Sequence, residues 1–153
     1  MSPHFDSLET RNAAERESAL MHSLSAHVAH AQASASAFTQ LLAGVDAAAV
    51  NSRAALARLP VVRKHELMER QQASRAGGGD PFGGFSAIGW RGLVRGQGAR
   101  RVFQSPGPIY EPEGQRSDYW RCGRTMAAAG FEAGDLVHNC FSYHLTPGAW
   151  IME

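Results

Sequence analysis

Residues Gln104–Gly114 read Q-S-P-G-P-I-Y-E-P-E-G and follow the apolar pair Val102-Phe103. The pair favours a strand over residues 100–104, so the quoted segment is the connection that leaves this strand. Its three prolines and two glycines are typical of a turn, and α/β proteins bind ligands at the ends of strands. The segment nevertheless contains two glutamates and no lysine. It is therefore a phosphate-binding loop, a degenerate form of one, or only a turn.

Downstream of this segment the sequence predicts a helix and a second strand. Asp118 is a typical N-cap for a helix over residues 119–129, which Gly130 would close. Apolar residues then favour a strand over residues 136–141. Strand, loop, helix and strand are the beginning of an α/β layer, although two strands alone do not make a stable sheet.

Upstream, the first part of the chain is predicted to be helical. Residues 9–34 lack proline and glycine and carry leucines and a valine at steps of four, which indicates an amphipathic helix. A short helix over residues 38–43 should end at Gly44. Asp46 and Ser52 have the side chains of N-caps and predict two further short helical pieces.

The fold class predicted from these elements is α/β, with a helical N-terminal half followed by the first strands of an incomplete sheet. The glycines of residues 77–84 disfavour regular structure, because each would lose much backbone entropy, and they predict a long surface loop. The predicted division is helical over 1–75, a glycine-rich loop over 76–99, and the start of the sheet over 100–153.

Composition limits the classes of function. The 153 residues are about one domain, with 44% hydrophobic and 19% charged residues, which are ordinary globular values. A formal charge of +1 gives no reason to expect nucleic acid as a partner. Lys64 is the only lysine, so arginine supplies nearly all of the positive charge.

Two observations predict a cytoplasmic location. Cys122 and Cys140 lack C-x-x-C spacing, and we expect reduced, buried thiols of an intracellular protein. The N-terminus has no apolar signal segment, and no apolar run is long enough to cross a bilayer, so no membrane contact is expected.

Several familiar sites are rejected on their spacing. Lys64 is not followed by Ser or Thr, and Gly96-Gln97-Gly98 lacks a third glycine, so neither common nucleotide fingerprint is present. His27 and His30 share a helix face with His22 nearby, but no carboxylate or cysteine completes a metal site. The arginines of residues 91–101 favour a solvated loop over a nucleic-acid patch, because only one aromatic residue accompanies them.

A resemblance to a known family covers nearly the whole chain. Six motifs occur in the same order as in the N-terminal part of phenylacetate-CoA ligase-like enzymes, members of the acyl-adenylate-forming superfamily. They are F-D-S-L-E-T, S-A-F, L-P-V-V-R-K-H-E-L, D-P-F-G-G-F, S-P-G-P-I-Y-E-P and G-F-E-A-G-D-L-V-H-N-C-F-S-Y-H-L-T-P-G.

This resemblance implies an activity and its cofactors. Such ligases use ATP and Mg²⁺ to convert a carboxylic acid, phenylacetate for example, into an acyl-adenylate, and the thiol of coenzyme A then displaces AMP. By the same resemblance, His144 occupies the position that lies against the acyl group near the path of the thiol. Phe141 and Tyr143 would supply apolar walls of the acyl pocket.

The family's phosphate loop has the form S-S-G-T-T-G-K-P and binds the β- and γ-phosphates through backbone N–H groups, hydroxyls and a lysine. Ser105, Gly107 and Pro112 match this form. Glu111 stands where the lysine would be, which places negative charge beside a polyanion, and two of the replacements are prolines that lack an N–H donor. The five replacements are Pro106, Pro108, Ile109, Tyr110 and Glu111.

The later family motifs, which hold adenine, ribose and Mg²⁺, and the C-terminal domain with its lysine would lie beyond Glu153. We therefore expect this chain alone to be inactive and its sheet to be incomplete. The alternative hypothesis is a non-catalytic remnant or protein-interaction module, with homo-oligomers formed through the unfinished sheet.

Overall fold

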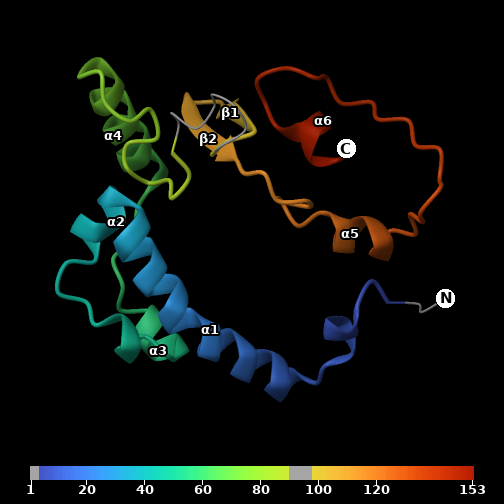
Figure 1. The fold of residues 1–153 in the computed structure, drawn as a ribbon, viewed down its shortest axis with the longest axis horizontal. Coiled ribbons are helices and arrows are strands. Elements are labelled where there is room, and N and C mark those ends of the chain that lie inside the picture. Colours follow the sequence, from blue (N-terminus) through green and yellow to red (C-terminus); the bar gives the residue numbers. More distant parts are fainter. Residues whose placement is uncertain (1–3, 90–97) are drawn as a thin grey trace.

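The computed structural model describes residues 4–89 and 98–153, and within them the protein is mixed α/β (Figure 1). A helical N-terminal part is followed by a two-stranded antiparallel sheet and two short helices. The helical part contains η1 (Ser7–Thr10), α1 (Ala13–Ser34), α2 (Ser36–Leu41), η2 (Ala47–Ala49), α3 (Arg53–Leu56) and α4 (Lys64–Ala76); the remainder contains β1 (Arg101–Ser105), β2 (Ile109–Glu113), α5 (Gly123–Ala128) and α6 (Gly148–Ile151).

The long helix α1 begins later than residue 9, where the sequence predicted its start. Asn12 is its N-cap: the Asn12 side chain accepts from the N–H of Glu15 at 2.9 Å, and the Glu15 carboxylate accepts from the N–H of Asn12 at 3.2 Å. This capping box satisfies two backbone donors and separates α1 from the 3-10 turn η1.

A small apolar cluster holds the helical part together. Its buried members are Val28 of α1, Leu42, Val50 and Ala55. Gln32 of α1 donates from Nε2 to the carbonyls of Leu42 and Val45, at 3.1 and 2.9 Å. These bonds provide partners for backbone carbonyl groups beyond the end of α2. Leu20, which the sequence placed on the same face, is 56% exposed because the cluster reaches only the C-terminal half of α1.

Local capping signals upstream of α4 are confirmed. The Asp46 carboxylate accepts from the N–H of Ala48 at 2.9 Å, and the Ser52 hydroxyl accepts from the N–H of Ala55 at 3.2 Å. Gly44 has φ of +79°, as expected for a residue that ends a helix in the left-handed region.

The predicted loop at residues 77–84 contains no helix or strand, but it is only partly a surface loop. Phe82 is 1% exposed. The Asp80 carboxylate accepts from the N–H groups of Phe82 and Gly84 at 3.0 and 2.9 Å, which bends the chain so that Phe82 points inward. The Gly84 carbonyl then accepts from the N–H of Ala37, which joins the loop to α2 at 3.0 Å.

The segment Gln104–Gly114 forms most of a β-hairpin. Strand β1 confirms the strand predicted at 100–104, but residues 109–113 are a second strand and not part of a loop. The two strands pair antiparallel, with Ser105 opposite Ile109 at the turn and Arg101 opposite Glu113 at the open end. Phe103 and Ile109 are buried on one face of the hairpin, and the register places Glu111 and Glu113 on the same face.

Both edges of this hairpin are met by groups from outside the sheet. Gln71 of α4, 2% exposed, donates from Nε2 to the Tyr110 carbonyl at 2.9 Å and accepts from the Tyr110 N–H at 2.8 Å. On the other edge, Gln104 donates its N–H to the Leu145 carbonyl at 2.9 Å. The Gln71 amide therefore takes the place of a neighbouring strand at one residue.

Two predictions for residues after the hairpin are wrong. Helix α5 begins at Gly123, because Asp118 has φ of +48° and its carboxylate accepts from the N–H of Gly123 at 3.0 Å, leaving residues 119–122 outside the helix. No strand forms over 136–141, where Leu136 is fully exposed and Val137 and Phe141 are also exposed. In Figure 1 this region is a long irregular connection between α5 and α6.

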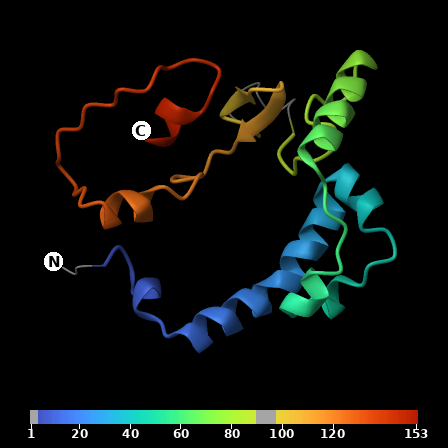
Figure 2. The same ribbon diagram turned by 180° about the vertical axis from the view of Figure 1, so that it is seen from behind.

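The two views place the N-terminal segment beside α5 (Figures 1 and 2). Arg124 of α5 forms ion pairs with Asp6 and with Glu9, the latter at 3.2 Å, and its guanidinium lies 5.8 Å from the centre of the Phe5 ring. Segments near the two ends of the sequence are thus joined directly. No helix among residues 4–89 and 98–153 has the length and apolar character needed to cross a bilayer.

Candidate functional site

The turn of the hairpin carries the predicted phosphate-loop residues Ser105 and Gly107. Residues 106–108 are exposed, and Gly107 has φ of +144°, a conformation that side chains disfavour. The Ser105 hydroxyl lies 3.5 Å from the Ile109 carbonyl across the closing pair. Within 106–108 only Gly107 has a backbone N–H to offer a ligand, because its two neighbours are prolines.

The other two predicted phosphate-loop residues lie in β2, beyond the turn. Both backbone polar groups of Tyr110 bond to Gln71, and the Arg75 guanidinium lies 4.5 Å from the centre of the Tyr110 ring. Tyr110 is therefore held by α4 and has no free backbone group for a phosphate. Glu111 is exposed and extends on the opposite side of the strand.

Ser105 and Glu111 line a cavity of about 520 Å³ with residues from three other segments. Arg63 and Lys64, at the N-terminus of α4, line the same cavity. Neither cation forms an ion pair within the described residues. The remaining lining residues are apolar: Phe38, Val62, Leu67, Phe85 and Ile109.

Sequence reasoning discounted Lys64 because it lacks the spacing of a nucleotide motif. The lysine is far from the hairpin in sequence, and only the packing of α4 against β2 brings the two together. The spacing of residues along the chain therefore held no signal for this site. The two cations that line this cavity therefore come from the N-terminus of α4, which is distant in sequence from the hairpin.

The predicted catalytic residue His144 lies in the exposed segment before α6. Its Nδ1 lies 3.1 Å from the N–H and 3.0 Å from the hydroxyl of Thr146, and its carbonyl accepts from Nε1 of Trp150 at 3.2 Å. Neither His144 nor the predicted acyl-pocket residues Phe141 and Tyr143 line the 520 Å³ cavity. The segment nevertheless passes beside β1 through the bond between Gln104 and Leu145.

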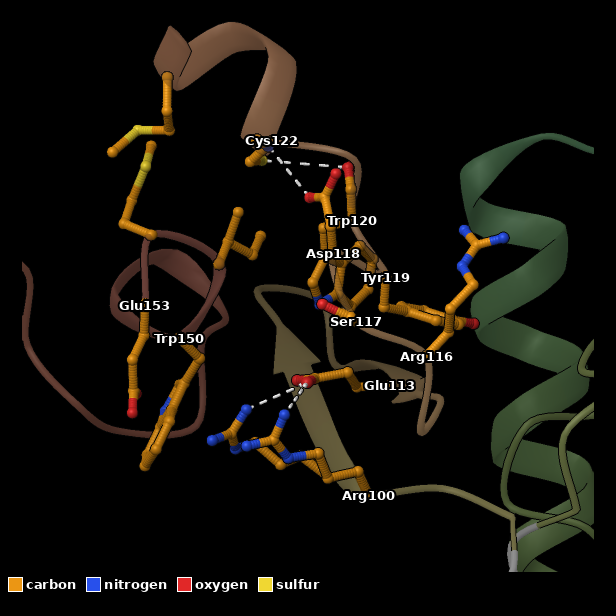
Figure 3. A pocket seen from close by; sticks show the side chains of 15 residues that line it. Arg100, Glu113, Arg116, Ser117, Asp118, Tyr119, Trp120, Cys122, Trp150 and Glu153 are labelled. Atoms are coloured by element: carbon orange, nitrogen blue, oxygen red, sulfur yellow. Dashed lines mark hydrogen bonds and ion pairs between the residues drawn. The ribbon is translucent and has the colours of Figure 1, made fainter. Parts of the chain in front are cut away.

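A second cavity, of about 440 Å³, lies between the hairpin, the chain before α5, and α6 (Figure 3). Glu113 of β2 lies at its centre, with Trp150 on one side and Ser117 and Trp120 on the other. The Glu113 side chain is 6% exposed, and its Oε1 accepts from Nη1 of Arg101 at 3.0 Å. Arg100 is more distant, with Nη1 at 4.0 Å from the same oxygen.

Two buried polar atoms at this cavity have no hydrogen-bond partner. They are Oε2 of Glu113 and Nε1 of Trp120. Such groups are uncommon in folded proteins, and each needs a protein, water or ligand partner to offset the loss of hydration. No pattern along the chain indicated them, because Glu113 lies in the segment interpreted as a turn and Trp120 in the helix predicted over residues 119–129.

Trp150 links the second cavity to the predicted acyl-pocket residues. The Arg101 guanidinium lies 4.4 Å from the centre of the Trp150 ring, and Tyr143 contacts the same ring edge-on at 4.8 Å between centres. The His144 carbonyl holds the indole nitrogen. Tyr143 and His144 therefore lie behind Trp150 and fix its position, while Phe141 is 58% exposed.

Other candidate groups remain separate. His22, His27 and His30 are exposed on α1, and the described part of the chain holds no cluster of three His, Cys, Asp or Glu residues suited to a metal ion. Cys140 is exposed and Cys122 half-buried, so the prediction of two buried thiols is wrong. In the predicted arginine loop, Trp90 and residues 91–97 lie outside the described residues.

No family model, no curated protein and no solved structure matches this chain.

Proposed function

We propose that the chain is the N-terminal segment of an ATP-dependent, AMP-forming carboxylate–CoA ligase of the phenylacetate-CoA ligase-like type. The six ordered motifs motivate the proposal. The hairpin turn at Ser105 and Gly107 would face the phosphates of ATP, and the acyl group would lie toward His144. Such a reaction uses cytoplasmic pools of ATP and coenzyme A, which agrees with the predicted location.

The observation that carries this proposal is the shared cavity of Lys64, Arg63 and the hairpin. A polyphosphate needs positive charge beside it, and the charged side chain that the hairpin adds to this cavity is the carboxylate of Glu111 in β2. Two cations without ion-pair partners in the described residues line the same space, which restores the sign that an anion requires. A lysine acts on phosphate as a point charge and an arginine as a bidentate fork.

The chain's own residues would act by binding and orientation. When bound, ATP with Mg²⁺ would supply a phosphorus centre activated toward a carboxylate. Lys64 and Arg63 would hold the departing phosphates, and Ser105 would donate its hydroxyl to them.

Binding of ATP to the chain tests the role of the two cations. In Lys64→Gln we expect affinity for Mg-ATP to fall roughly 10- to 100-fold, the value of a hydrogen bond to a charged group. Arg58→Gln is the matched control, because Arg58 is an exposed arginine outside the cavity, and its affinity should be unchanged. Glu111→Lys should strengthen binding by about 1 kcal/mol or more.

Equal ATP affinity in Lys64→Gln and Arg58→Gln would remove the phosphate role of the cavity. In the full-length protein, adenylation requires acid-dependent exchange of pyrophosphate into ATP. A complete protein that shows no exchange with a wide panel of acids would remove the ligase proposal itself.

A second candidate function, a protein-interaction module, is favoured by the exposed apolar residues between α5 and α6. Leu136 is fully exposed, and Phe141 and Leu145 are 58% and 64% exposed. Apolar side chains gathered on one segment are typical of a surface that a partner covers. Sedimentation of the chain tests this: association that Leu136→Ser weakens without changing ATP affinity supports the module, and a sharply melting monomer counts against it.

A further inference from the structure

Residues 5–9 form a short strap that lies against α5 (Figures 1 and 2). The strap is joined to α5 through Arg124, whose guanidinium pairs with Asp6 and with Glu9, the latter at 3.2 Å, and lies 5.8 Å from the centre of the Phe5 ring. A cavity of about 820 Å³ lies between the strap and the chain around α5, and Phe5, Leu8 and Glu9 form its strap side. The strap therefore covers an open space at this end of the molecule.

The strap is held loosely. No residue of η1 is buried, and Phe5 is 52% exposed. The Arg124 side chain is 47% exposed, so water and salt screen its ion pairs. Helix α1 begins behind its own cap, because the Asn12 side chain bonds the N–H of Glu15. Opening of the strap therefore breaks contacts with one arginine and leaves the cap of α1 in place.

The other side of the cavity carries Arg116, Arg121 and Arg124, which we call the arginine face. Of these three, only Arg124 forms an ion pair within residues 4–89 and 98–153. The chain that presents them is bent sharply, since Asp118 and Arg121 have φ of +48° and +59°. The Asp118 carboxylate accepts from the N–H of Gly123 at 3.0 Å, which holds this bend.

The balance of charge at the arginine face depends on the strap. With the strap in place, three guanidinium groups face three carboxylates, those of Asp6, Glu9 and Asp118. When the strap leaves, the carboxylates of Asp6 and Glu9 leave with it. The arginine face then keeps only Asp118 and has an excess of two positive charges. Clusters of arginines with such an excess bind acidic motifs of proteins, because each guanidinium matches a carboxylate as a fork.

We propose that the arginine face is a docking site for an acidic segment of a partner protein, and that residues 5–9 block this site. The strap occupies Arg124 with two carboxylates and thereby shows the chemistry that the face accepts. A partner's carboxylates pair first with Arg116 and Arg121, which have no ion pair in the described residues, and then displace the strap from Arg124. Neither the phosphate cavity nor the ligase activity enters this proposal.

Binding of a fluorescein-labelled oligoglutamate peptide to the whole chain, followed by anisotropy at low salt, tests the blocking role. The double variant Asp6→Asn/Glu9→Gln removes the charges of the strap, and its amides can still accept from the N–H groups of Leu8 and Phe5. We expect it to bind the peptide roughly three- to tenfold more tightly than the unaltered chain, the value of one or two exposed ion pairs.

The matched control for net charge is Glu69→Gln/Glu132→Gln, which removes two exposed carboxylates outside this cavity. Its affinity for the peptide should equal that of the unaltered chain. If the strap variant and this control bind the peptide equally, the strap does not block the face and the proposal is overturned.

Two arginine variants, made in the strap double variant, locate the docking site. Arg121→Gln should weaken peptide binding severalfold, and it leaves the fold intact because Arg121 forms no ion pair in the part of the chain that the structure describes. Arg58→Gln removes an exposed arginine outside the cavity and should change nothing. Equal affinities of these two variants would place the peptide elsewhere and remove the assignment.

Displacement of the strap is observed directly in the unaltered chain. The heteronuclear NOE of residues 5–9 should fall when the peptide saturates the chain, and Arg124→Gln should lower it without peptide. A strap that stays ordered at saturation contradicts the proposal. An oligodeoxythymidylate of similar charge that binds as tightly as the peptide would show unselective attraction of anions, which also overturns the assignment of an acidic protein segment.

Discussion

The Gln71 side chain is the contact whose removal should reveal most about how the helical part holds the hairpin. Gln71→Met keeps the approximate length and volume of the side chain but deletes both of its bonds to Tyr110, at 2.9 and 2.8 Å. Because Gln71 is 2% exposed, water cannot replace its amide without opening the contact between α4 and β2.

The expected loss follows from two hydrogen bonds and the two backbone groups left behind. Each bond contributes about 1 kcal/mol net, and a buried donor or acceptor without a partner costs about 1–3 kcal/mol. Tyr110 is only half-buried, so water would recover part of the second amount. We therefore expect the free energy of unfolding to fall by about 2–4 kcal/mol, which lowers Tm by roughly 5–15 °C at this chain length.

Urea unfolding followed by circular dichroism measures the change, and amide exchange at Tyr110 reports it locally. Gln72→Met is the matched control, because Gln72 is exposed on the same helix and should change stability by less than about 0.5 kcal/mol. Equal unfolding midpoints for the two variants, or unaltered exchange at Tyr110, would show that Gln71 does not hold the strand edge.

Two further predictions concern the loop and the long helix. Gly84→Ala should destabilise by about 1–2 kcal/mol or more, because φ is +80° and a Cβ would lie 3.0 Å from the N atom of Ala37. Gly89→Ala is the control: its Cβ would meet no atom of the described residues within 4 Å, so thermal melts should show no change. The Arg53 guanidinium holds the pKa of Glu17 below its ordinary value of about 4.5 through a bidentate ion pair. The ion pair contributes its full stability at pH values above the ordinary pKa of Glu17, and this stability is lost as pH falls through the lowered pKa. Arg53→Gln should therefore raise the Glu17 pKa in an NMR titration and remove this pH dependence of stability.

Elements fixed by neighbouring residues were predictable from the sequence. Asp46 and Ser52 cap the short helices where their side chains indicated, because a cap bonds to an N–H only two or three residues away. The same local reasoning failed at Asp118. Its carboxylate does bond forward, but to Gly123, since Trp120 packs against Tyr119 and Phe103 instead of entering the helix.

Elements fixed by distant residues were not predictable. The prolines and glycines of residues 104–114 predicted a turn, yet residues 109–113 pair with β1, and Gln71 of α4 bonds the outer edge of that strand. For residues 136–141 the error was reversed, because a strand was predicted and none forms. Apolar composition suits a strand only where another strand offers its backbone groups, and no partner strand meets this segment within the described residues.

The residues of the candidate site were likewise predictable only where neighbouring residues determine the structure. Ser105 and Gly107 were found because they are adjacent in sequence, and they do form the turn. Lys64 and Glu113 were missed, because what makes each of them notable is a cavity assembled from separate segments. The sequence next to a single charged residue does not indicate which distant residues will surround it in the fold.

The ion pairs of Arg124 have a consequence for how the protein is made. Arg124 and Asp6 are 118 positions apart, so the N-terminal segment emerges from the ribosome long before its partner exists. At about 5–20 residues per second, residues 5–9 wait roughly 6–24 s for α5 to be synthesised. During that interval Phe5 lacks the Arg124 guanidinium beside its ring, so residues 5–9 reach their final contacts only after α5 has been made.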